Sequence, residues 1–542
     1  MKKFVVLAAV VTLVSLLVGC GGGGSTSSGG GAAVTRDPNV KVDIFDKSLP
    51  KMKVRVATLT GYTIPDSRTE KWLEDRYNID IEIVPLPGAS EAPAKTSLLM
   101  ADDKERPEVV WWSGMEADFS KWKDAGLLVD LTDYMDKYTV MRDYYDGQDP
   151  RIMFYASSSG GRVFRIPGDV SEPGCETLWI RKDWLDKLGL PIPKTMEEYN
   201  AALYAFTNND PDGNGRKDTY GLGGQGNDLR SFWPWQQGAG TGRGNVYFQF
   251  VKMPDGSYEF SGATEDTRKW LGQVAQLMKD GVINPNVVVT TTNRNEEMAR
   301  GGFGSMHAWV AWNNPNTTFD SFYATNPDAE WIPIRMPAGD TPGNDGYGIE
   351  NAGFLSAWCF FGITKNASDP ERLYAIWDDM GAPEPYVIKR WGIEGQEYVT
   401  NPDGSHNLII RPGSNEALEK QIGIDLFHDL FARKDEYNFS NTPETVQIFA
   451  DRTRDSRAAY DIGIEKKDPN MYTAWNEYGA ELLDIRNAYI YNVIGGTESI
   501  NDWDAYIARL KANGLDQVLD ELKELYPKQQ GEERTYLSSR GF

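Results

Sequence analysis

The chain has 542 residues, of which 40% are hydrophobic and 12% aromatic; at roughly 100–200 residues per domain this is enough for two or more domains, and it excludes disorder throughout and a small disulfide scaffold. The 79 acidic and 56 basic residues give a formal net charge of −23, which disfavours nucleic acid as a partner because phosphates would be repelled. The three Cys and three His show no zinc-site spacing, which argues against zinc and haem chemistry.

The first twenty residues have the pattern of an export signal. Two lysines precede an apolar run at 4–18, which is too short for a membrane span of about 20 apolar residues. Leu17-Val18-Gly19-Cys20 resembles the lipobox of bacterial lipoproteins, in which the cysteine is lipidated. We therefore predict a signal peptide at 1–19 and a lipidated Cys20 with a flexible Gly/Ser tether at 20–47. This places the body outside the cytoplasm, held to the membrane only by lipid; an ordinary cleaved signal peptide is the alternative.

A strand, helix, strand pattern follows the tether. Residues 52–56 and 79–83 alternate apolar and polar side chains as half-buried strands do, and Ser67 with Glu70 form a capping-box pattern between them. Such a unit implies a parallel sheet, to which residues 107–112 add a third strand. Ligands of open α/β sheets bind beyond the carboxyl ends of the strands. We therefore expect ligand contacts from the loop 61–65, which includes Tyr62, and from the loop 112–116, which begins with Trp112.

Apolar residues at helical spacing predict further helices, whose apolar stripes we expect to face a core. The predicted helices lie at 183–188, 266–279, 370–380, 503–510 and 515–525, the last two separated by a break at Gly514. No repeat with a period of roughly 20–50 residues is evident, which argues against a solenoid or a propeller.

Residues 210–218, Asp-Pro-Asp-Gly-Asn-Gly-Arg-Lys-Asp, follow the D-x-D-x-N-G spacing of a calcium-binding loop. Alternate residues of such a loop converge hard oxygen ligands, and Gly215 permits the sharp turn. The twelfth position is Gly221 rather than a bidentate Glu, so water or a distant residue must complete the coordination. We predict a structural Ca²⁺ rather than a calcium sensor; an Asp/Gly turn without metal is the alternative. The predicted ligands are Asp210, Asp212, Asn214, Arg216 (through its carbonyl) and Asp218.

Aromatic residues form the second candidate site. The C–H face of a pyranose stacks on Trp or Tyr rings, and polar side chains bind the hydroxyls at its edge. The chain has 17 Trp; we expect most of them in the core, but several lie beside Gly, Pro or Asn rather than in helical stripes. The candidates for sugar contact from this pattern are Trp112, Trp235, Trp312, Trp391 with Glu394 three residues later, and Tyr62.

Five short motifs occur in a fixed order behind the lipobox: 126–132 (GLLVDLT), 161–167 (GRVFRIP), 179–185 (WIRKDWL), 299–306 (ARGGFGSM) and 392–398 (GIEGQEY). Together they resemble the extracellular solute-binding proteins of ABC sugar importers, in particular the longer lipoprotein members that bind oligosaccharides. The resemblance covers nearly the whole mature chain.

This resemblance implies an α/β fold of the periplasmic-binding-protein type (type II), in which a ligand cleft separates two lobes that are each discontinuous in sequence. It implies lobe 1 at 48–167 and 353–422, and lobe 2 at 168–352 and 423–542. It also implies that Trp309, which lies where sugar-binding relatives place a stacking Trp, contacts the ligand from lobe 2.

We therefore predict a monomeric substrate-binding lipoprotein of the cell membrane that captures an oligosaccharide, closes around it and delivers it to the permease subunits of an ABC importer. The ATPase would be a separate protein, and this chain would be no enzyme. One alternative is a secreted carbohydrate-active enzyme, since glycoside hydrolysis needs only two carboxylates, although the catalytic motifs G-x-S-x-G and H-E-x-x-H are absent from the sequence. The other alternative is a surface glycan sensor or adhesin with the same fold.

The identity of the sugar does not follow from the sequence. The negative net charge disfavours a polyanionic ligand such as a uronate, but a local patch of arginines would reverse that preference. A disulfide between Cys175 and Cys359 and two unpaired thiols are equally compatible with the sequence. The arginines that would form such a patch are Arg162, Arg181, Arg230 and Arg243.

Overall fold

The computed structural model describes residues 37, 39–59, 65–88, 91–112, 115–157, 161–168, 176–224, 226, 228–289, 301–309, 322–323, 326–340, 347–348, 359–402, 406–409, 463–464, 466–467 and 471–542. They belong to one compact unit, Asp37–Phe542. The predicted signal peptide, Cys20 and most of the tether lie outside the described residues. Within the described part, no helix combines the length and the apolar character needed to cross a membrane.

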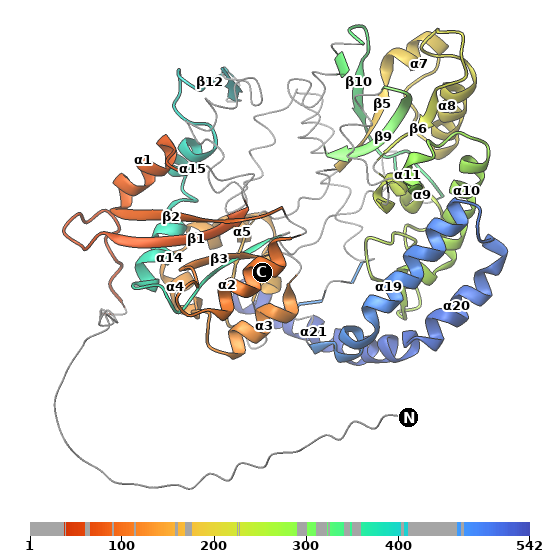
Figure 1. Ribbon diagram of the computed structural model, residues 1–542. Helices are drawn as coiled ribbons and strands as arrows, with labels where there is room; N and C mark the ends of the chain where they lie inside the picture. Colours follow the sequence, from red (N-terminus) through yellow and green to blue (C-terminus); the bar gives the residue numbers. More distant parts are fainter. Residues whose placement is uncertain are drawn as a thin grey trace, which may run out of the picture. The chain divides into compact units, whose positions relative to one another are not determined.

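The first sheet has five strands in the order β2-β1-β3-β11-β4 (Figure 1). β1 (Met52–Leu59) pairs in parallel with β2 (Ile79–Leu86) and β3 (Val109–Trp112). β11 (Phe360–Ile363) is antiparallel to β3 and to β4 (Ile166–Pro167). With α1 (Arg68–Tyr77) between β1 and β2, the predicted strand, helix, strand unit is confirmed.

The start of α1 shows how the local sequence sets an element boundary. The Ser67 hydroxyl accepts a hydrogen bond from the Glu70 amide at 3.1 Å, as in a capping box. The Glu70 carboxylate accepts from the amide of Asp66 at 2.9 Å, one residue before the cap. Burial of Glu70 raises its pKa to about 7, because water no longer solvates the charged form fully.

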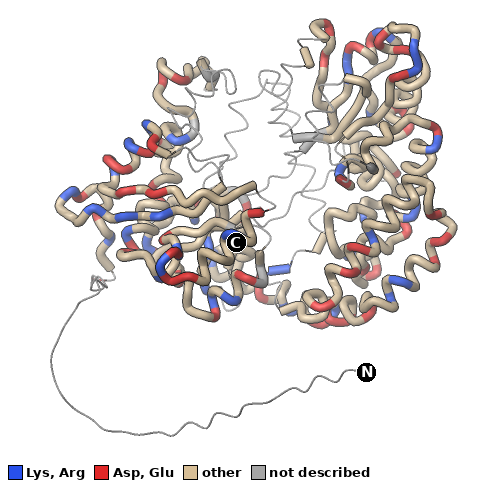
Figure 2. Tube along the Cα trace, in the orientation of Figure 1, with Lys and Arg blue, Asp and Glu red and all other residues tan. Residues whose placement is uncertain are grey.

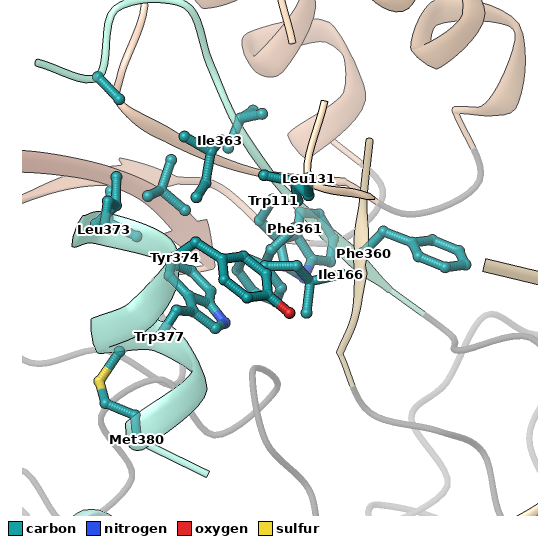
Figure 3. Close-up of a cluster of buried hydrophobic side chains, with 14 of the residues drawn as sticks. Trp111, Leu131, Ile166, Phe360, Phe361, Ile363, Leu373, Tyr374, Trp377 and Met380 are labelled. Atoms are coloured by element: carbon teal, nitrogen blue, oxygen red, sulfur yellow. The ribbon is translucent and has the colours of Figure 1, made fainter. Parts of the chain in front are cut away.

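Core 1 is the set of buried apolar side chains between this sheet and its helices, drawn from residues 44–166 and 359–386. Figure 3 shows part of it, where Trp111, Phe361 and Trp377 meet between β3, β11 and α14. Near the start of the described chain, Val42 packs against this core, and its backbone amide donates a hydrogen bond to Tyr138 Oη at 2.8 Å. The helices of core 1 are α1, α2 (Ala92–Ala101), α3 (Glu116–Asp124), α4 (Thr132–Lys137), α5 (Val140–Gln148), α6 (Arg151–Ala156), α14 (Pro370–Asp379) and α15 (Pro383–Arg390).

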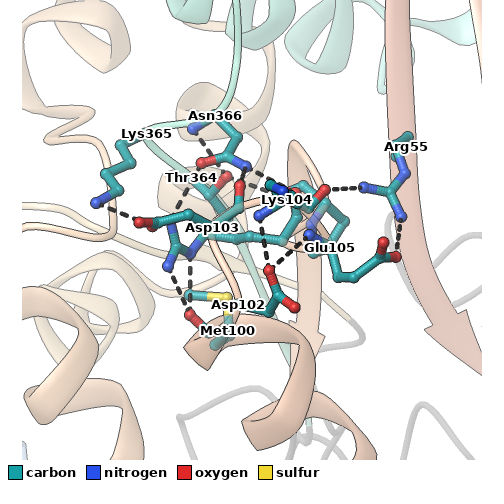
Figure 4. Close-up of polar contacts among 11 residues, drawn as sticks. Arg55, Met100, Asp102, Asp103, Lys104, Glu105, Thr364, Lys365 and Asn366 are labelled. Atoms are coloured by element: carbon teal, nitrogen blue, oxygen red, sulfur yellow. Dashed lines mark hydrogen bonds and ion pairs between the residues drawn. The ribbon is translucent and has the colours of Figure 1, made fainter.

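A buried polar network fastens the distant β11 segment to the loop before β3 (Figure 4). Arg106, 2% exposed, donates through Nε and Nη2 to the Met100 carbonyl at 3.0 and 2.8 Å. Its Nη1 donates to Asp103 at 2.6 Å and to Asn366 Oδ1 at 3.2 Å. Because Asn366 follows β11 in sequence, this one guanidinium joins the two separate parts of core 1.

The second sheet has the order β10-β5-β9-β6. β9 (Phe303–Trp309) is antiparallel to β5 (Glu176–Arg181) and parallel to β6 (Tyr220–Leu222), and β10 (Trp331–Ile334) is antiparallel to β5. Core 2, the apolar interior around this sheet and its helices, draws on residues 178–334 and 464–526. The main helices of core 2 are α7 (Lys182–Leu188), α8 (Met196–Asn208), α9 (Trp233–Gly238), α10 (Glu265–Lys279), α19 (Thr473–Ile494), α20 (Trp503–Ala512) and the first part of α21 (Leu515–Ser539).

Both cores are discontinuous in sequence, as the predicted two-lobed fold requires.

Acidic and basic residues are interleaved along the helices of the described chain, as Figure 2 shows for α19, α20 and α21. Two short antiparallel hairpins complete the architecture: β7 (Phe250–Lys252) with β8 (Tyr258–Phe260), and β12 (Tyr398–Thr400) with β13 (His406–Leu408).

Candidate functional site

The carboxyl ends of β1 and β3 share one edge of the first sheet. Their parallel register places Ala57 beside Val110, so Leu59 at the end of β1 is level with Trp112 at the end of β3. The Trp112 backbone therefore lies at the edge where ligands of α/β sheets bind. The side chain of Trp112 and the whole of Tyr62 lie outside the described part of the chain.

Trp391 and Glu394 belong to a small aromatic turn that includes the β12–β13 hairpin. Trp391 is 4% exposed and contacts the rings of Tyr398 and His406, with centroids 6.3 and 5.4 Å away. Glu394 is exposed. The side chain of Trp391 is thus largely occupied by its own turn, and Glu394 is the more accessible of the two predicted contacts.

An ion pair fastens this aromatic turn to the edge of the first sheet. Arg68, at the start of α1, donates through Nη1 to Glu397 at 2.7 Å. Burial opposes ionisation of Glu397, but the hydrogen bonds from Arg68 and from the Ile393 amide prevail and lower its pKa. Because a βαβ helix starts beside the carboxyl end of the preceding strand, the turn lies on the same side of the sheet as Trp112.

The carboxyl ends of β6 and β9 likewise share one edge of the second sheet, since Leu222 pairs in parallel with Ser305. Trp309 is the last residue of β9 and pairs with Glu176 at the start of β5. Trp112 and Trp309 therefore belong to different sheets. The side chain of Trp309 and all of Trp312 fall outside the described residues.

The structure shows that Trp235, a predicted sugar contact, is a core residue. It is 0% exposed, its indole Nε1 donates to Asn200 Oδ1 at 3.1 Å, and its ring packs on Tyr199 with centroids 5.7 Å apart. Trp235 lies on the face of α9 that packs into core 2. The expectation of ligand contact came from the neighbouring Pro and Gln residues, which do not reveal which helix face a residue occupies.

Trp233, two residues earlier, is also largely buried, at 7% exposed, but it is not one of the side chains of core 2. Its ring stacks on His307 with centroids 5.0 Å apart and planes inclined by 10°, and it contacts Tyr247 at 5.5 Å. Tyr247 is 38% exposed. His307 lies two residues before Trp309 on β9, and alternate residues of a strand share a face. The three rings, here called the aromatic edge, therefore lie at the carboxyl edge of sheet 2; the spacing from Trp309 back to His307 was the available sequence signal.

The four arginines considered for an acidic ligand each have a partner within the protein. Arg181 makes a bidentate pair with Asp183 at 2.8 and 2.6 Å. The other contacts are Arg162 with Asp130, Arg230 with Asp228, and Arg243 Nε with the Lys252 carbonyl.

The predicted calcium loop is exposed and tightly turned. The Asn214 amide Nδ2 donates to Asp212 at 2.8 Å and to Asp218 at 3.1 Å, and the Asn214 backbone amide donates to Asp210 at 3.1 Å. Gly215 adopts a φ of +75°, the left-handed conformation that glycine tolerates. Two carboxylates thus converge on the Asn214 side-chain amide, and a third accepts from its backbone amide.

The carboxylate, amide and carbonyl oxygens of this loop are donors that suit a hard cation. Desolvation, followed by the nearby carboxylates of Asp210 and Asp218, raises the pKa of Asp212 because concentrated negative charge opposes ionisation. Within the described residues, however, no three His, Cys, Asp or Glu side chains are grouped closely enough to hold a metal ion as they stand. The Asn214 side-chain amide lies between the carboxylates of Asp212 and Asp218. The Arg216 backbone amide donates to Asn214 Oδ1 at 2.7 Å, and Arg216 Nε pairs with Asp218 at 3.4 Å.

Comparison with known proteins gives a family. The family model of the bacterial extracellular solute-binding protein matches residues 57–371. The fructooligosaccharide ABC transporter substrate-binding protein FusA of Streptococcus pneumoniae is 25% identical over 301 residues, 53% of this chain and 52% of FusA, so that match spans about half the length of FusA. The polygalacturonan/rhamnogalacturonan-binding protein YtcQ of Bacillus subtilis is 22% identical over 495 residues, 89% of this chain and 93% of YtcQ. Lipoprotein LipO of Bacillus subtilis is 26% identical over 485 residues, 84% of this chain and 88% of LipO.

Solved structures show the same fold. FusA of Streptococcus pneumoniae in complex with kestose aligns with a TM-score of 0.66 at 18% identity, covering 89% of this chain and 100% of FusA. The alginate-binding protein AlgQ2 without calcium ion aligns with a TM-score of 0.65 at 18% identity, covering 88% of this chain and 98% of AlgQ2. The predicted two-lobed α/β fold is thus confirmed. Since the family model matches more than half of the chain, this protein belongs to the bacterial extracellular solute-binding protein family.

Proposed function

We propose that this chain is the substrate-binding lipoprotein of an ABC importer, which captures an oligosaccharide between its two lobes and delivers it to membrane permease subunits. Membership of the solute-binding family is the observation that carries the proposal. The names of FusA and YtcQ state a fructooligosaccharide substrate and binding of polygalacturonan or rhamnogalacturonan, which supports a carbohydrate ligand. The chain acts as a monomer and turns nothing over, in keeping with relatives that are binding proteins.

The lobes are proposed to be 48–167 with 353–422, and 168–352 with 423–542. The composition of the two cores supports this division, since core 1 draws on 44–166 and 359–386 and core 2 on 178–334 and 464–526. The carboxyl edges of the two sheets then supply the ligand contacts.

The contacts proposed from lobe 1 are Trp112, Glu394 and the loop that contains Tyr62. Those from lobe 2 are Trp309, Trp312 and Tyr247, the exposed ring of the aromatic edge, which is supported by the buried rings of Trp233 and His307. Rings on both lobes would stack on successive sugar units, and contacts made by both lobes favour the closed state over the open one.

Binding is tested by isothermal titration of the purified protein with kestose, oligogalacturonides and short alginate fragments, with chromatography of the mixtures afterwards. Saturable binding of one glycan without cleavage is the expected result. Cleavage that disappears when a carboxylate such as Glu394 is changed to Gln would replace the proposal by the enzyme alternative. Absence of binding to every glycan, with binding of peptides instead, would refute the carbohydrate assignment.

We further propose that the 210–218 loop holds a structural Ca²⁺. Two structural relatives bear on calcium: AlgQ2 was solved without its calcium ion, and FusA was solved as an EF-hand mutant. Rotation of the Asn214 amide by half a turn would direct Oδ1 instead of Nδ2 toward Asp212 and Asp218, which is the arrangement a hard cation needs. Bound Ca²⁺ would neutralise the clustered carboxylates and fix the loop that joins α8 to β6.

The calcium proposal is tested by the melting temperature with Ca²⁺ and with chelator. Wild type should melt higher with Ca²⁺, and Asp212→Asn should remove that difference. Asp255→Asn, which changes an exposed turn aspartate that accepts from the Ser257 amide at 2.9 Å, should keep it. A chelator-insensitive wild type would leave the loop as a metal-free turn.

The membrane attachment is proposed to be a lipid on Cys20 at the extracytoplasmic face. The lipobox-like sequence and the likeness to lipoprotein LipO support it. Cys20→Ser should release the protein from the membrane fraction into the medium, and retention of the variant on the membrane would contradict the proposal.

A further inference from the structure

The C-terminal helix α21 contacts both cores. Its first half supplies Leu515, Val518 and Leu522 to core 2, where it packs among α19 and α20 (Figure 1). Its distal half, residues 528–539, turns to different neighbours. There Tyr536 packs against core 1 and against Phe154 of α6.

The distal contacts are specific and mostly polar. Tyr155 Oη of α6 donates to Glu533 at 2.9 Å, and the rings of Phe154 and Tyr536 lie 5.6 Å apart at 52°. Arg540, just beyond the helix end, pairs with Asp146 of α5 and donates to Tyr536 Oη at 3.0 Å. Side chains over two turns of helix thus hold onto α5 and α6.

A discontinuity separates the two halves. Pro527 lies inside α21, and a proline in a helix interior removes one backbone hydrogen bond and favours a bend there. Two residues later, buried Gln529 accepts from the Lys467 amide at 2.9 Å and from Tyr472 Oη at 3.2 Å. The helix is therefore held by two hydrogen bonds to Gln529, two residues after the proline.

We propose that α21 is a brace between the two lobes, flexible at Pro527, whose distal contacts with α5 and α6 stabilise one relative arrangement of the lobes and so set the affinity for ligand. This rests on the proposed function, in which ligand capture moves the lobes. A contact influences such an equilibrium only if it differs between the two states. Because Gln529 and the first half hold the helix to lobe 2 while Glu533 and Arg540 hold it to α6 and α5, a movement of the lobes must bend the helix or change one of the two sets of contacts.

The brace is tested first without any sugar, by electron paramagnetic resonance distances between spin labels at L98C in lobe 1 and E265C in lobe 2, with the three native cysteines changed to serine. Leu98 is 70% exposed and the Glu265 side chain 79% exposed. Arg540→Ala with Glu533→Gln should shift or broaden the distance distribution. Pro527→Ala, which restores the missing N–H and stiffens the helix, should narrow it.

The matched control is Arg509→Ala. Arg509 of α20 pairs with Glu498 at 3.2 Å. Like Arg540→Ala, this variant removes an ion pair of an arginine near the C-terminus, but both partners belong to lobe 2. It should leave the distance distribution unchanged. If the double variant behaves like this control, α21 is a static part of lobe 2 and the brace is refuted.

The second readout is affinity for kestose and for an oligogalacturonide. Where either binds wild type, the double variant should change the dissociation constant threefold or more while Arg509→Ala does not. An unchanged constant together with an altered distance distribution would refute the link to affinity. If neither sugar binds wild type, the proposed carbohydrate function loses its support, and the sugar-free distances still decide whether α21 is a brace.

Discussion

The assignment of Trp235 to the core and Trp233 to the binding edge gives a sharp prediction, because the two residues lie on the same short helix. A fully buried Trp side chain removes about 200 Å² from water, worth roughly 5 kcal/mol at 25 cal/mol per Å², and measured Trp→Ala changes in cores fall at about 3–5 kcal/mol. Trp235→Ala should therefore destabilise lobe 2 by about 4 kcal/mol. Trp235→Phe, which keeps most of the volume but leaves Asn200 Oδ1 without its indole donor, should cost about 1–2 kcal/mol.

Trp233→Ala should have the opposite profile. It removes a ring outside core 2 that stacks on His307 and contacts the exposed Tyr247. Because Tyr247 loses this support, the variant should weaken glycan binding about tenfold, which corresponds to 1.4 kcal/mol. Urea unfolding followed by circular dichroism gives the stabilities; at an m-value of about 3 kcal/mol/M, 4 kcal/mol moves the midpoint by more than about 1 M. Normal binding by Trp233→Ala, with binding lost in well-folded Trp235→Phe, would show that the assignment of the two residues is reversed.

Three further predictions concern stability. Folded Glu70 has a pKa of about 7 and so keeps a proton that the unfolded chain releases above pH 4.5. The free energy of unfolding of the wild type should therefore fall by about 1–2 kcal/mol between pH 4.5 and 7, and that of Glu70→Gln should not. Parallel pH profiles of the two proteins in urea titrations would contradict this. Arg106→Ala should cost about 2 kcal/mol by leaving the buried Met100 carbonyl without its two donors, and a loss below about 1 kcal/mol would show that water replaces the guanidinium. Gly339→Ala would place a Cβ 1.7 Å from the Gly238 carbonyl oxygen and should lower the melting temperature by several degrees. The Cβ of the control Gly272→Ala meets nothing nearer than 4.0 Å, so this variant should raise the melting temperature slightly. Equal melting temperatures of the two variants would refute the steric argument.

Elements specified by local pattern were predictable from the sequence. The alternation at 52–56 and 79–83 gave a parallel pair, and the stripe at 266–279 became α10, Glu265–Lys279. The helix after Gly514 was predicted only to residue 525, because its apolar residues at helical spacing end there. In the structure α21 continues through Pro527 to Ser539, since packing of both flanking halves outweighs the hydrogen bond that a proline removes.

Features that depend on distant contacts were not predictable. Nothing local to Arg106 indicates that Asn366, 260 residues later, accepts from it. The choice between Trp233 and Trp235 likewise depends on which face of α9 meets core 2, and a six-residue helix carries too few positions to define an apolar stripe. The His307–Trp233 stack needs β9 and α9 in place together. Of the predicted sugar contacts, Trp112 and Trp309 end strands at sheet edges whereas Trp235 is buried, and sugar binding by the edge residues stays a prediction.

The charge of the sugar follows from the arginines rather than from the net charge. Arg181 and Arg230 make bidentate pairs with Asp183 and Asp228, so a uronate carboxylate at either position would have to displace an aspartate that is already in place. Such an exchange replaces one charge-assisted pair with another and gains little, while the displaced aspartate would repel the ligand. Arg181 and Arg230 therefore serve the fold, and an acidic glycan would need its cation elsewhere, for example from Arg243, whose Nε donates to the Lys252 carbonyl rather than to a carboxylate. Kestose should thus bind more tightly than a galacturonide of equal length in a titration at low salt, and the reverse order would show that such a cation exists.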